Sequence, residues 1–430
     1  MSPLFKSYFK TTAACVALAV AAVVVALLAL RWLPRVFGPL IAPVSVLFAL
    51  IAAILACAGA VVLIRYGRIT RGERDLFLEL NRSREPQAIE AGELPRATAL
   101  RRWLARRLLG HELLTGDLVE IRPWAEIAAT LDAQGCLEQL PFMPEMLAMC
   151  GRRARVFRCA HRLFDYRKSR RMRHMDGVVL LAGAVCDGAS HGHCEAACHT
   201  IWKAAWLRRV PHTERTGITP LSSDSPVRTG AAVPQLGTAE PRYVCQLTQL
   251  NAASHRVGRL GVAELVRPLV AGNVSPGAFV VASLTYAFNE LQQLRGGYAF
   301  PEFESTLQEP DKSDEPALQA GDRVVVRSAA EIRATLNARL EHRGLGFESD
   351  MLKHCGHGYC VQAQIRKVID IVTGEMRLLK TPAYTLRQVH FSGERQFFNS
   401  QYEPLFWRGA WLQRKGGSVS ATSGGTICDP

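Results

Sequence analysis

Three cysteines and three histidines lie within the seventeen residues from Cys186 to Trp202, "CDGASHGHCEAACHTIW". Zinc in structural sites takes thiolate and imidazole ligands, and four of them complete its tetrahedral coordination. Cys186, His191, Cys194 and Cys198 supply such a set, and their short spacings allow one loop to wrap around a single ion. The sequence therefore predicts a metal site made of these four residues. Zinc is the expected metal, and an iron–sulfur cluster is the alternative because soft sulfur ligands suit it as well.

Other interpretations of this loop stay open. His193 and His199 could replace His191 as a ligand or hold a ligand in place by a hydrogen bond. The cysteines could also pair as disulfides or remain unligated, although disulfides are rare in a reducing cytosol. A second group, "HCGHGYC" from His354 to Cys360, could bind a metal by itself but has no further close ligand.

No pattern of nucleophile and base typical of catalysis is present, and no phosphate loop or dinucleotide fingerprint is found. Asp187 and Glu195 are the only acid–base candidates near the predicted metal, and we interpret them as solvated loop carboxylates. Whether the protein is an enzyme is thus left open. A small-molecule substrate would need an open ligand position on the metal.

Two uncharged apolar runs near the N-terminus, Thr11 to Leu30 and Val36 to Ile64, each reach the roughly 18–20 residues that cross a bilayer as a helix. The short link "RWLPR" between them predicts a transmembrane helical hairpin. A cleaved signal peptide fits poorly because a second apolar run follows at once.

Basic residues flank the hairpin unequally: Lys6 and Lys10 precede it, Arg31 and Arg35 lie in the link, and Arg65, Arg68, Arg71 and Arg74 follow it. Because the more basic side of a span stays in the cytoplasm, we expect a multi-pass protein of the cell inner membrane with both termini cytoplasmic. The net charge of +14 favours anionic partners. The segment "ATALRRWLARRLLG" predicts a basic amphipathic helix suited to an anionic leaflet, so lipid is the expected partner and nucleic acid is not.

The chain contains an internal repeat. "GDLVEIRPWAEIAATLDA" from Gly116 matches "GDRVVVRSAAEIRATLNA" from Gly321 at eleven of eighteen positions, an offset of 205 residues (321 − 116 = 205). The same offset carries "WKAAWLRR" from Trp202 onto "WRGAWLQR" from Trp407. A match held at one offset over some ninety residues indicates two copies of one domain. The second copy has lost every cysteine and histidine of the metal loop.

The predicted fold class is α+β: the transmembrane hairpin is followed by tandem small β-barrel domains of the SH3-like kind, joined by a linker and a helical segment. The expected segments are a transmembrane hairpin (1–66), juxtamembrane amphipathic helices (67–112), a first repeat domain with the metal loop (113–209), a flexible linker (210–241), a helical connector (242–318), a second repeat domain without that loop (319–414) and a disordered tail (415–430).

These motifs resemble an uncharacterised bacterial family with a duplicated domain. "GDLVEIR", "LPFMPEMLAMCGRRARV", "CDGASHGHCEAAC" and "WKAAWL" resemble its first half, and "LQQLRGGYAFPEFE" with "GDRVVVRSAAEIRATL" resembles its second half. The likeness covers roughly Gly116 to Trp411. It implies a link to glycan or specialised-metabolite biosynthesis, near whose genes such proteins tend to be encoded. Its second copy also tends to carry cysteines, and this chain departs from that pattern.

Two functions follow as expectations. The first is a membrane-anchored, metal-binding protein that recruits or supports a protein partner at the cytoplasmic membrane face. The second is a membrane-bound, metal-dependent enzyme of a biosynthetic pathway. A closed four-ligand site would favour the first, and three protein ligands plus water would favour the second. A nucleic-acid-binding membrane protein is a third, weaker hypothesis.

Overall fold

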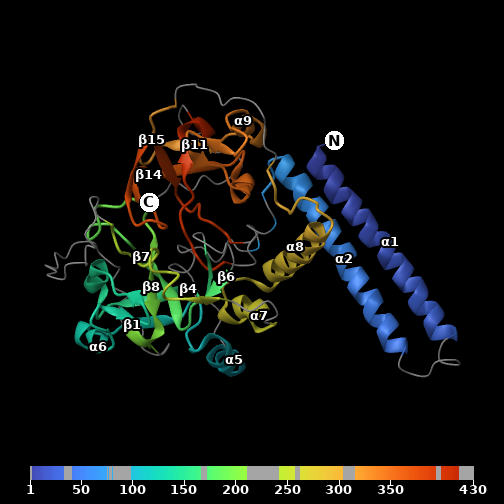
Figure 1. Cartoon of the computed structure of the whole chain (residues 1–430), viewed down its shortest axis with the longest axis horizontal. Helices are drawn as coiled ribbons and strands as arrows, with labels where there is room; N and C mark the ends of the chain where they lie inside the picture. The colour runs from blue at the N-terminus through green and yellow to red at the C-terminus, as the bar shows by residue number, and fades with distance from the viewer. Residues whose placement is uncertain are drawn as a thin grey trace. The chain divides into compact units, whose positions relative to one another are not determined.

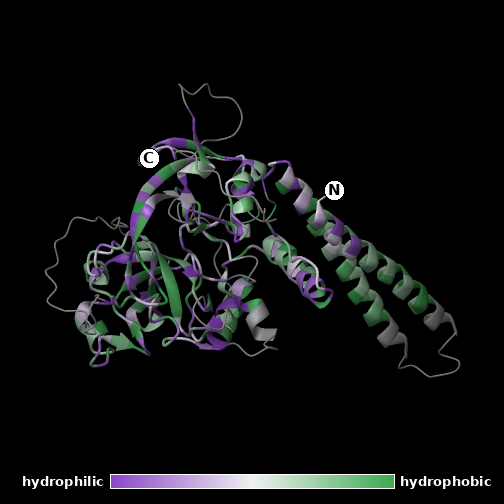
Figure 2. Cartoon of the chain, turned by 45° about the horizontal axis from the view of Figure 1, so that its top comes forward, coloured by the Kyte–Doolittle hydropathy of each residue, from purple (hydrophilic) through white to green (hydrophobic). Residues whose placement is uncertain are grey.

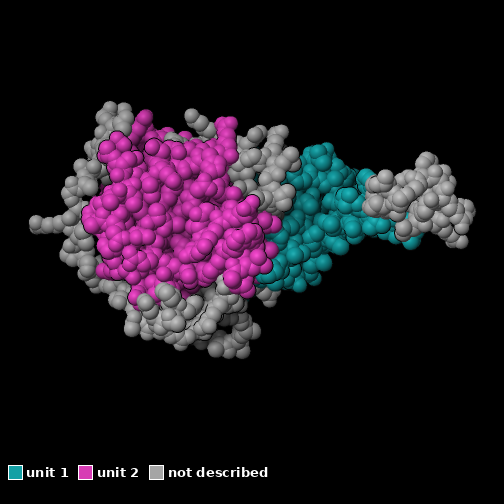
Figure 3. All heavy atoms as spheres, turned by 90° about the horizontal axis from the view of Figure 1, so that it is seen from below, with its two compact units in different colours: residues 1–80, 276–313, 325–357 teal, residues 81–275, 314–324, 358–430 magenta. Residues whose placement is uncertain are grey.

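The computed structural model describes residues 2–32, 41–74, 76, 80, 98–165, 172–210, 242–256, 262–303, 315–393 and 399–415 (Figure 1). Residues 33–35 of the predicted hairpin link, residues 211–241 of the predicted linker (210–241) and residues 416–430 of the predicted tail (415–430) lie outside these residues. The chain divides into two compact units, coloured separately in Figure 3. Unit 1 comprises residues 1–80, 276–313 and 325–357, and unit 2 comprises residues 81–275, 314–324 and 358–430.

Unit 1 contains the two apolar helices expected from the sequence. Helix α1 spans Pro3–Trp32 and α2 spans Ile41–Thr70, so α2 continues beyond the predicted end of the hairpin at residue 66. Stretches of 25 residues in each, Pro3–Leu27 and Val46–Thr70, are long and apolar enough to cross a membrane. Figure 2 shows the hydrophobic colouring along both helices.

A third helix, α8 (Pro276–Leu294), packs against α1 and α2 within unit 1. Its fully buried Phe288 meets the ring of Tyr8 at a centroid distance of 5.9 Å, and Phe300 meets Tyr8 at 5.7 Å. Arg65 is buried and donates a hydrogen bond to Thr285 Oγ1 at 3.1 Å. The predicted helix in the connector is therefore a packed helix, and its polar end contacts α1 through Gln292 and Thr11 at 2.9 Å.

The first β-sheet lies in unit 2 and has the strand order β8-β7-β4-β1-β9. Its strands are β1 (Leu118–Ile121), β4 (Arg153–Cys159), β7 (Val178–Val185), β8 (His199–Lys203) and β9 (Leu207–Arg209). The edge strands β8 and β9 are joined only by the three-residue 3₁₀ helix η4 (Ala204–Trp206). Because so short a link brings the two edges together, the sheet must curl. Its inner side holds the fully buried Trp202 and Trp206.

A second five-stranded sheet has the order β16-β15-β14-β11-β17. Its strands are β11 (Arg323–Val326), β14 (Gly358–Ile369), β15 (Met376–Leu386), β16 (Trp407–Arg408) and β17 (Leu412–Arg414), with the 3₁₀ helix η7 (Gly409–Trp411) between the last two. The boundary between the units falls within β11. Strands β14 and β15 have 12 and 11 residues and pair with each other as a long antiparallel hairpin.

Equivalent hydrogen bonds recur in the two sheets. Asp117 accepts the N–H of Leu114 at 2.9 Å, and Asp322 accepts the N–H of Gln319 at 2.9 Å. The glycine before each aspartate has a φ of +91°. The shared "GD" motif thus has a structural role, since the aspartate closes the turn that leads into the strand.

The remaining elements connect and cover the sheets. They are α5 (Ala99–Leu109), α6 (Trp124–Ala128), α7 (Val262–Ala271), α9 (Ala329–Ala334), η3 (Pro144–Met149), η5 (Ser349–His354), the three-stranded sheet β10 (His255–Arg256), β6 (Met172–His174) and β5 (Arg162–Phe164), and the hairpins β2 (Cys136–Leu137) with β3 (Leu140–Pro141) and β12 (Glu341–His342) with β13 (Leu345–Gly346).

Candidate metal centre

The loop from residue 186 to 198, here called the Cys/His loop, joins β7 to β8 in unit 2. Its base is closed by a hydrogen bond from the backbone N–H of Cys186 to the carbonyl of Cys198, at 2.8 Å. Two of the predicted ligands are therefore held where the loop leaves and re-enters the sheet. The rigid sheet fixes the spacing of their backbones.

Gly188 allows the loop to fold back on itself. Its φ of +70° lies in the left-handed region, and a Cβ atom there would lie 2.1 Å from the carbonyl oxygen of Cys194. Only glycine fits this position, because any side chain would push Cys194 away. The turn thus places Cys194 close to the start of the loop.

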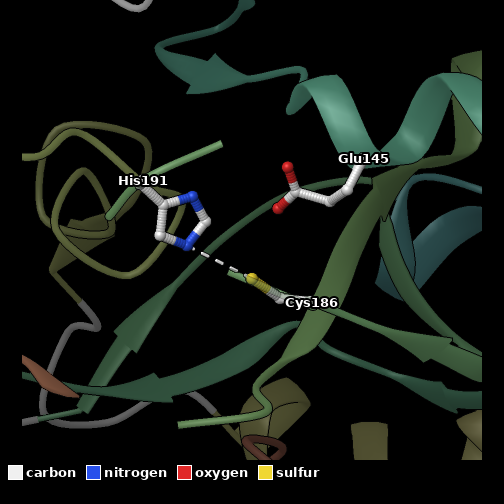
Figure 4. Close-up of side chains that lie close together, drawn as sticks. All are labelled: Glu145, Cys186 and His191. Atoms are coloured by element: carbon white, nitrogen blue, oxygen red, sulfur yellow. Dashed lines mark hydrogen bonds between the residues drawn. The ribbon is translucent and has the colours of Figure 1, made fainter. Parts of the chain in front are cut away.

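Three metal-binding side chains come together at this loop. The ligand atoms of Glu145, Cys186 and His191 lie within 4.8 Å of one another. Figure 4 shows the imidazole of His191 and the carboxylate of Glu145 facing the same space, with Cys186 Sγ 3.2 Å from His191 Nε2. Glu145 comes from the 3₁₀ helix η3, far from the loop in sequence. The arrangement offers a thiol, an imidazole and a carboxylate to one ion.

Ser190 links two of these groups. Its hydroxyl donates to Glu145 Oε2 at 2.8 Å, so its oxygen accepts from His191 Nδ1–H at 2.9 Å. This orients the ring so that Nε2 points at Cys186. A histidine whose other nitrogen is held in this way is typical of metal ligands. Glu145 Oε1 is buried and has no hydrogen-bond partner among the described residues, which leaves it available to a cation.

A cavity of about 50 Å³ adjoins these side chains. Its lining includes four cysteines, namely Cys186, Cys194, Cys198 and Cys245, each of which is a free thiol. The rest of the wall is largely apolar, with Met143, Leu247, Ile369 and Ile371 among the lining residues. We call this space the thiol cavity.

Two of the sulfurs accept hydrogen bonds from backbone N–H groups. Gly188 donates to Cys186 Sγ at 3.3 Å, and Ile369 donates to Cys194 Sγ at 3.3 Å. A neutral thiol is a weak acceptor, whereas hydrogen bonds to sulfur are a regular feature around metal-bound thiolates. Both bonds therefore fit thiolate ligands.

Cys245 lines the cavity because the neighbouring residue, Gln246, is hydrogen-bonded to β8. The amide of Gln246 accepts from the N–H of Ile201 at 2.7 Å and donates to the carbonyls of Ile201 at 2.8 Å and Pro141 at 3.0 Å. Gln246 is buried, so these bonds are shielded from water. They hold the segment that follows the linker against the first sheet.

The environment disfavours charged thiols in the absence of a cation. Burial raises the pKa of Cys198, and neighbouring Glu403, Cys245, Cys186 and Cys194 raise it further. Burial likewise raises the pKa of Cys186, with Glu145 adding to the effect. Burial lowers the pKa of His191. A bound metal would reverse this preference, since it stabilises thiolate and neutral imidazole.

The sequence prediction named four ligands, and all four line the thiol cavity. Cys186 and His191 belong to the close group, whereas Cys194 and Cys198 do not join it. Two residues were missed, Glu145 and Cys245. Cys245 has no spacing in the sequence that connects it to the loop, and neither has Glu145.

The other candidates take structural places. Glu195 Oε2 accepts from the N–H groups of Arg366 at 2.6 Å and Lys367 at 3.0 Å, and Asp187 accepts from Ala189 at 2.9 Å. His193 is exposed, whereas His199 lines the cavity and has its Nδ1 3.1 Å from the carbonyl of Tyr402. Both carboxylates thus accept hydrogen bonds from backbone N–H groups, which gives each of them a structural role.

The described residues hold a second group that could bind a metal, His174, Asp176 and His255. Arg267 Nη1 lies 2.6 Å from His174 Nδ1, and His174 Nε2 lies 2.8 Å from Asp176 Oδ1. A guanidinium in contact with the ring opposes a cation there. The "HCGHGYC" residues, which are all described, form no such group.

The segment that lies 205 residues after the Cys/His loop makes a similar turn, and its described residues, 391–393 and 399–403, include no cysteine or histidine. Gly393 has a φ of +69°, and a Cβ there would lie 2.3 Å from the carbonyl oxygen of Asn399, which stands where the first loop has Cys194. Asp350, at the position of Glu145, forms an ion pair with Lys353 at 2.9 Å. The positions equivalent to Ser190 and His191 lie outside the described residues.

Comparisons with protein-family models, with curated proteins and with solved structures find no match for this chain.

Proposed function

We propose that the chain is a membrane-anchored, metal-binding protein whose metal lies at the thiol cavity of unit 2. The observation that carries this proposal is the close group of Glu145, Cys186 and His191, which shares its cavity with further thiols. A thiol-rich set suits zinc or an iron–sulfur cluster. In the metal-bound protein, Ser190 would hold the His191 ring and the Glu145 carboxylate in place.

The two five-stranded sheets support tandem SH3-like domains as part of this proposal. Each has consecutive edge strands joined by a 3₁₀ turn, and the strand orders correspond one to one. Three of the five corresponding strands begin 205 residues apart, as β1 at Leu118 and β11 at Arg323 illustrate (323 − 118 = 205), whereas β7 and β15 differ by 198 and β8 and β16 by 208. We interpret them as two copies of one domain, of which the first is specialised for the metal, as the resemblance to the duplicated bacterial family also suggests.

Membrane anchoring is supported by α1 and α2, whose central residues expose many large apolar side chains. Helix α5 adds a surface suited to an anionic leaflet. Its Leu100 and Trp103 are exposed next to exposed Arg106 and Arg107, whereas Arg102 turns inward to pair with Asp117 at 2.8 Å. We place the protein in the inner membrane with cytoplasmic termini, where it would recruit or support a protein partner.

A metal-dependent enzyme of a glycan or specialised-metabolite pathway is the second candidate. One observation favours it: the close group supplies three protein ligands and adjoins a cavity with a largely apolar wall. Three ligands beside an open space are typical of catalytic zinc, where water or substrate takes the fourth position.

The test is elemental analysis of the full-length protein, purified in detergent without oxygen. We expect a stoichiometric metal, and protein without any metal would overturn the proposal. X-ray absorption at the metal edge then separates the two functions. A shell made only of protein ligands favours the anchored module, and a shell with an exchangeable oxygen favours the enzyme.

A further inference from the structure

We infer that Cys186, Cys194, Cys198 and Cys245 together hold an iron–sulfur cluster in the thiol cavity, with Cys245 as a ligand from outside the Cys/His loop. This inference rests on the proposed function, because it assumes that the cavity holds a metal. It names the cofactor class and replaces His191 by Cys245 in the ligand set expected from the sequence.

The first argument is that the four thiols surround one space from different segments. Cys186 and Cys198 close the base of the loop, Cys194 lies at its turn, and Cys245 lies beyond the linker. All four line the same cavity.

The second argument is the spacing of the sulfurs. Four thiolates on one zinc ion lie about 3.8 Å apart, given Zn–S bonds of about 2.3 Å and tetrahedral angles. Among the described residues, no three thiols lie within 4.8 Å of one another. A [4Fe–4S] cluster separates its four ligands further, because each thiolate then binds a different iron atom.

The third argument is the space between the sulfurs. A single ion enclosed by four ligands needs no cavity, yet about 50 Å³ is open here. A cavity of roughly 10–15 Å³ is enough to hold one water molecule, so this cavity has room for several atoms. The apolar wall and the N–H···S bonds to Cys186 and Cys194 are features that set the potential of such clusters.

His191 then has a supporting place. Its Nε2 lies 3.2 Å from Cys186 Sγ, and the Ser190–Glu145 pair fixes its ring. It would contact the sulfur of a ligand and affect the reduction potential of the cluster without binding iron. A bound cluster would also fasten the segment after the linker to the first sheet, since Cys245 belongs to that segment.

The experiment compares the full-length wild-type protein with Cys245→Ser, His191→Gln and the control Cys136→Ser, all purified in detergent without oxygen. Cys136 is a free, half-buried thiol outside the cavity lining. Iron, zinc, acid-labile sulfide and visible absorption are measured for each. We expect iron and sulfide in equal amounts and a brown chromophore in the wild type, the control and His191→Gln, and at least a fivefold loss of iron in Cys245→Ser.

Three results would overturn the inference. Zinc without sulfide in the wild type would do so while leaving the proposed function intact, and so would loss of the metal in His191→Gln with retention in Cys245→Ser. Absence of any metal would remove the proposed function as well. If Cys245→Ser does not fold, as judged by its melting transition, reconstitution of the wild-type apoprotein with ferrous iron and sulfide or with zinc decides the case. Failure to form a chromophore there contradicts a cluster.

Discussion

At the scale of single residues, two polar side chains hold the candidate centre together, the half-buried Ser190 and the buried Gln246. Ser190 joins His191 to Glu145, and Gln246 joins the cysteine-bearing segment after the linker to β8. Neither residue would act as a metal ligand. Their importance comes from burial, since a lost hydrogen bond in the interior leaves its partners without water to replace it.

Replacing Gln246 by Ala tests the second of these links. The change removes the hydrogen-bond partner of the Ile201 N–H, the Ile201 carbonyl and the Pro141 carbonyl. Each of these groups costs about 1–3 kcal/mol of stability if no water replaces the lost partner. We expect a lower melting temperature and reduced metal content. The control is Gln249→Ala, whose amide makes one long bond of 3.5 Å to Thr248. Equal behaviour of the two variants would show that Gln246 does not position Cys245.

His390 predicts a pH dependence of stability. Burial, with smaller contributions from His199 and Arg158, lowers its pKa to about 3, and its ring stacks on Tyr402 at 4.1 Å. Between pH 6.5 and about 3 the unfolded chain binds a proton at this residue that the folded chain does not bind. The contribution of neutral His390 to the free energy of unfolding is therefore complete above pH 6.5. As the pH drops below 6.5, the free energy of unfolding decreases by up to about 1.4 kcal/mol per pH unit.

The measurement is the melting temperature as a function of pH for the wild type and His390→Phe. Phenylalanine keeps the stacking on Tyr402 and removes the titrating nitrogen. We expect a shallower acid decline in the variant, with the part due to His199 remaining, because burial also lowers the pKa of that residue, to about 4. Superimposable profiles would exclude His390 as a source of the decline.

At the scale of elements, packing decides the role of α8. In unit 1 it buries Phe288 and Thr285 against α1 and α2 and leaves Leu294 85% exposed. The helix is thus a structural partner of the two long helices, and its buried face is distinct from its exposed face.

Phe288→Ala should weaken this packing. Removing a fully buried phenylalanine costs about 3–5 kcal/mol, so we expect faster proteolysis in the segment around α8 and a lower melting temperature in detergent. Leu294→Ala, on the same helix but exposed, serves as the control and should change little. A similar response from both variants would contradict the packing of α8 on the long helices.

At the scale of the whole molecule, the two long helices and the basic charge determine the expected place of the protein in the cell. The charge bias around the hairpin predicts that unit 2 and both termini face the cytoplasm. A reducing cytoplasm keeps cysteines available for metal, so the orientation and the metal proposal support each other.

Reporter fusions test this orientation. A green fluorescent protein fused to the C-terminus should be fluorescent in membranes of intact cells, and an alkaline phosphatase fused at the same point should be inactive. The control is the same pair of fusions on a protein of known periplasmic C-terminus. An active phosphatase fusion would place unit 2 on the opposite side and would weaken the case for free thiols.

Much of the fold could be predicted from sequence, because the signals are local. Uninterrupted apolar runs predict α1 and α2, and alternation with Gly and Asp at the turns predicts strands such as β1 and β11. The proposed ligands Cys186, His191, Cys194 and Cys198 come from the same kind of local signal, since they are close in the chain, and their binding of a metal stays a prediction. Such patterns depend on neighbours a few residues apart, so no tertiary information was needed.

Tertiary structure alone decided which distant residues join the loop. Glu145 lies 41 residues before Cys186, and Cys245 lies 47 residues after Cys198 (186 − 145 = 41; 245 − 198 = 47). Their side chains reach the cavity because a curled sheet, a 3₁₀ helix and the Gln246 hydrogen bonds bring these segments together. The spacing between the sulfurs, and with it the choice between a single ion and a cluster, is likewise a property of packing in three dimensions, because ligands contributed by separate segments have no fixed distance along the chain.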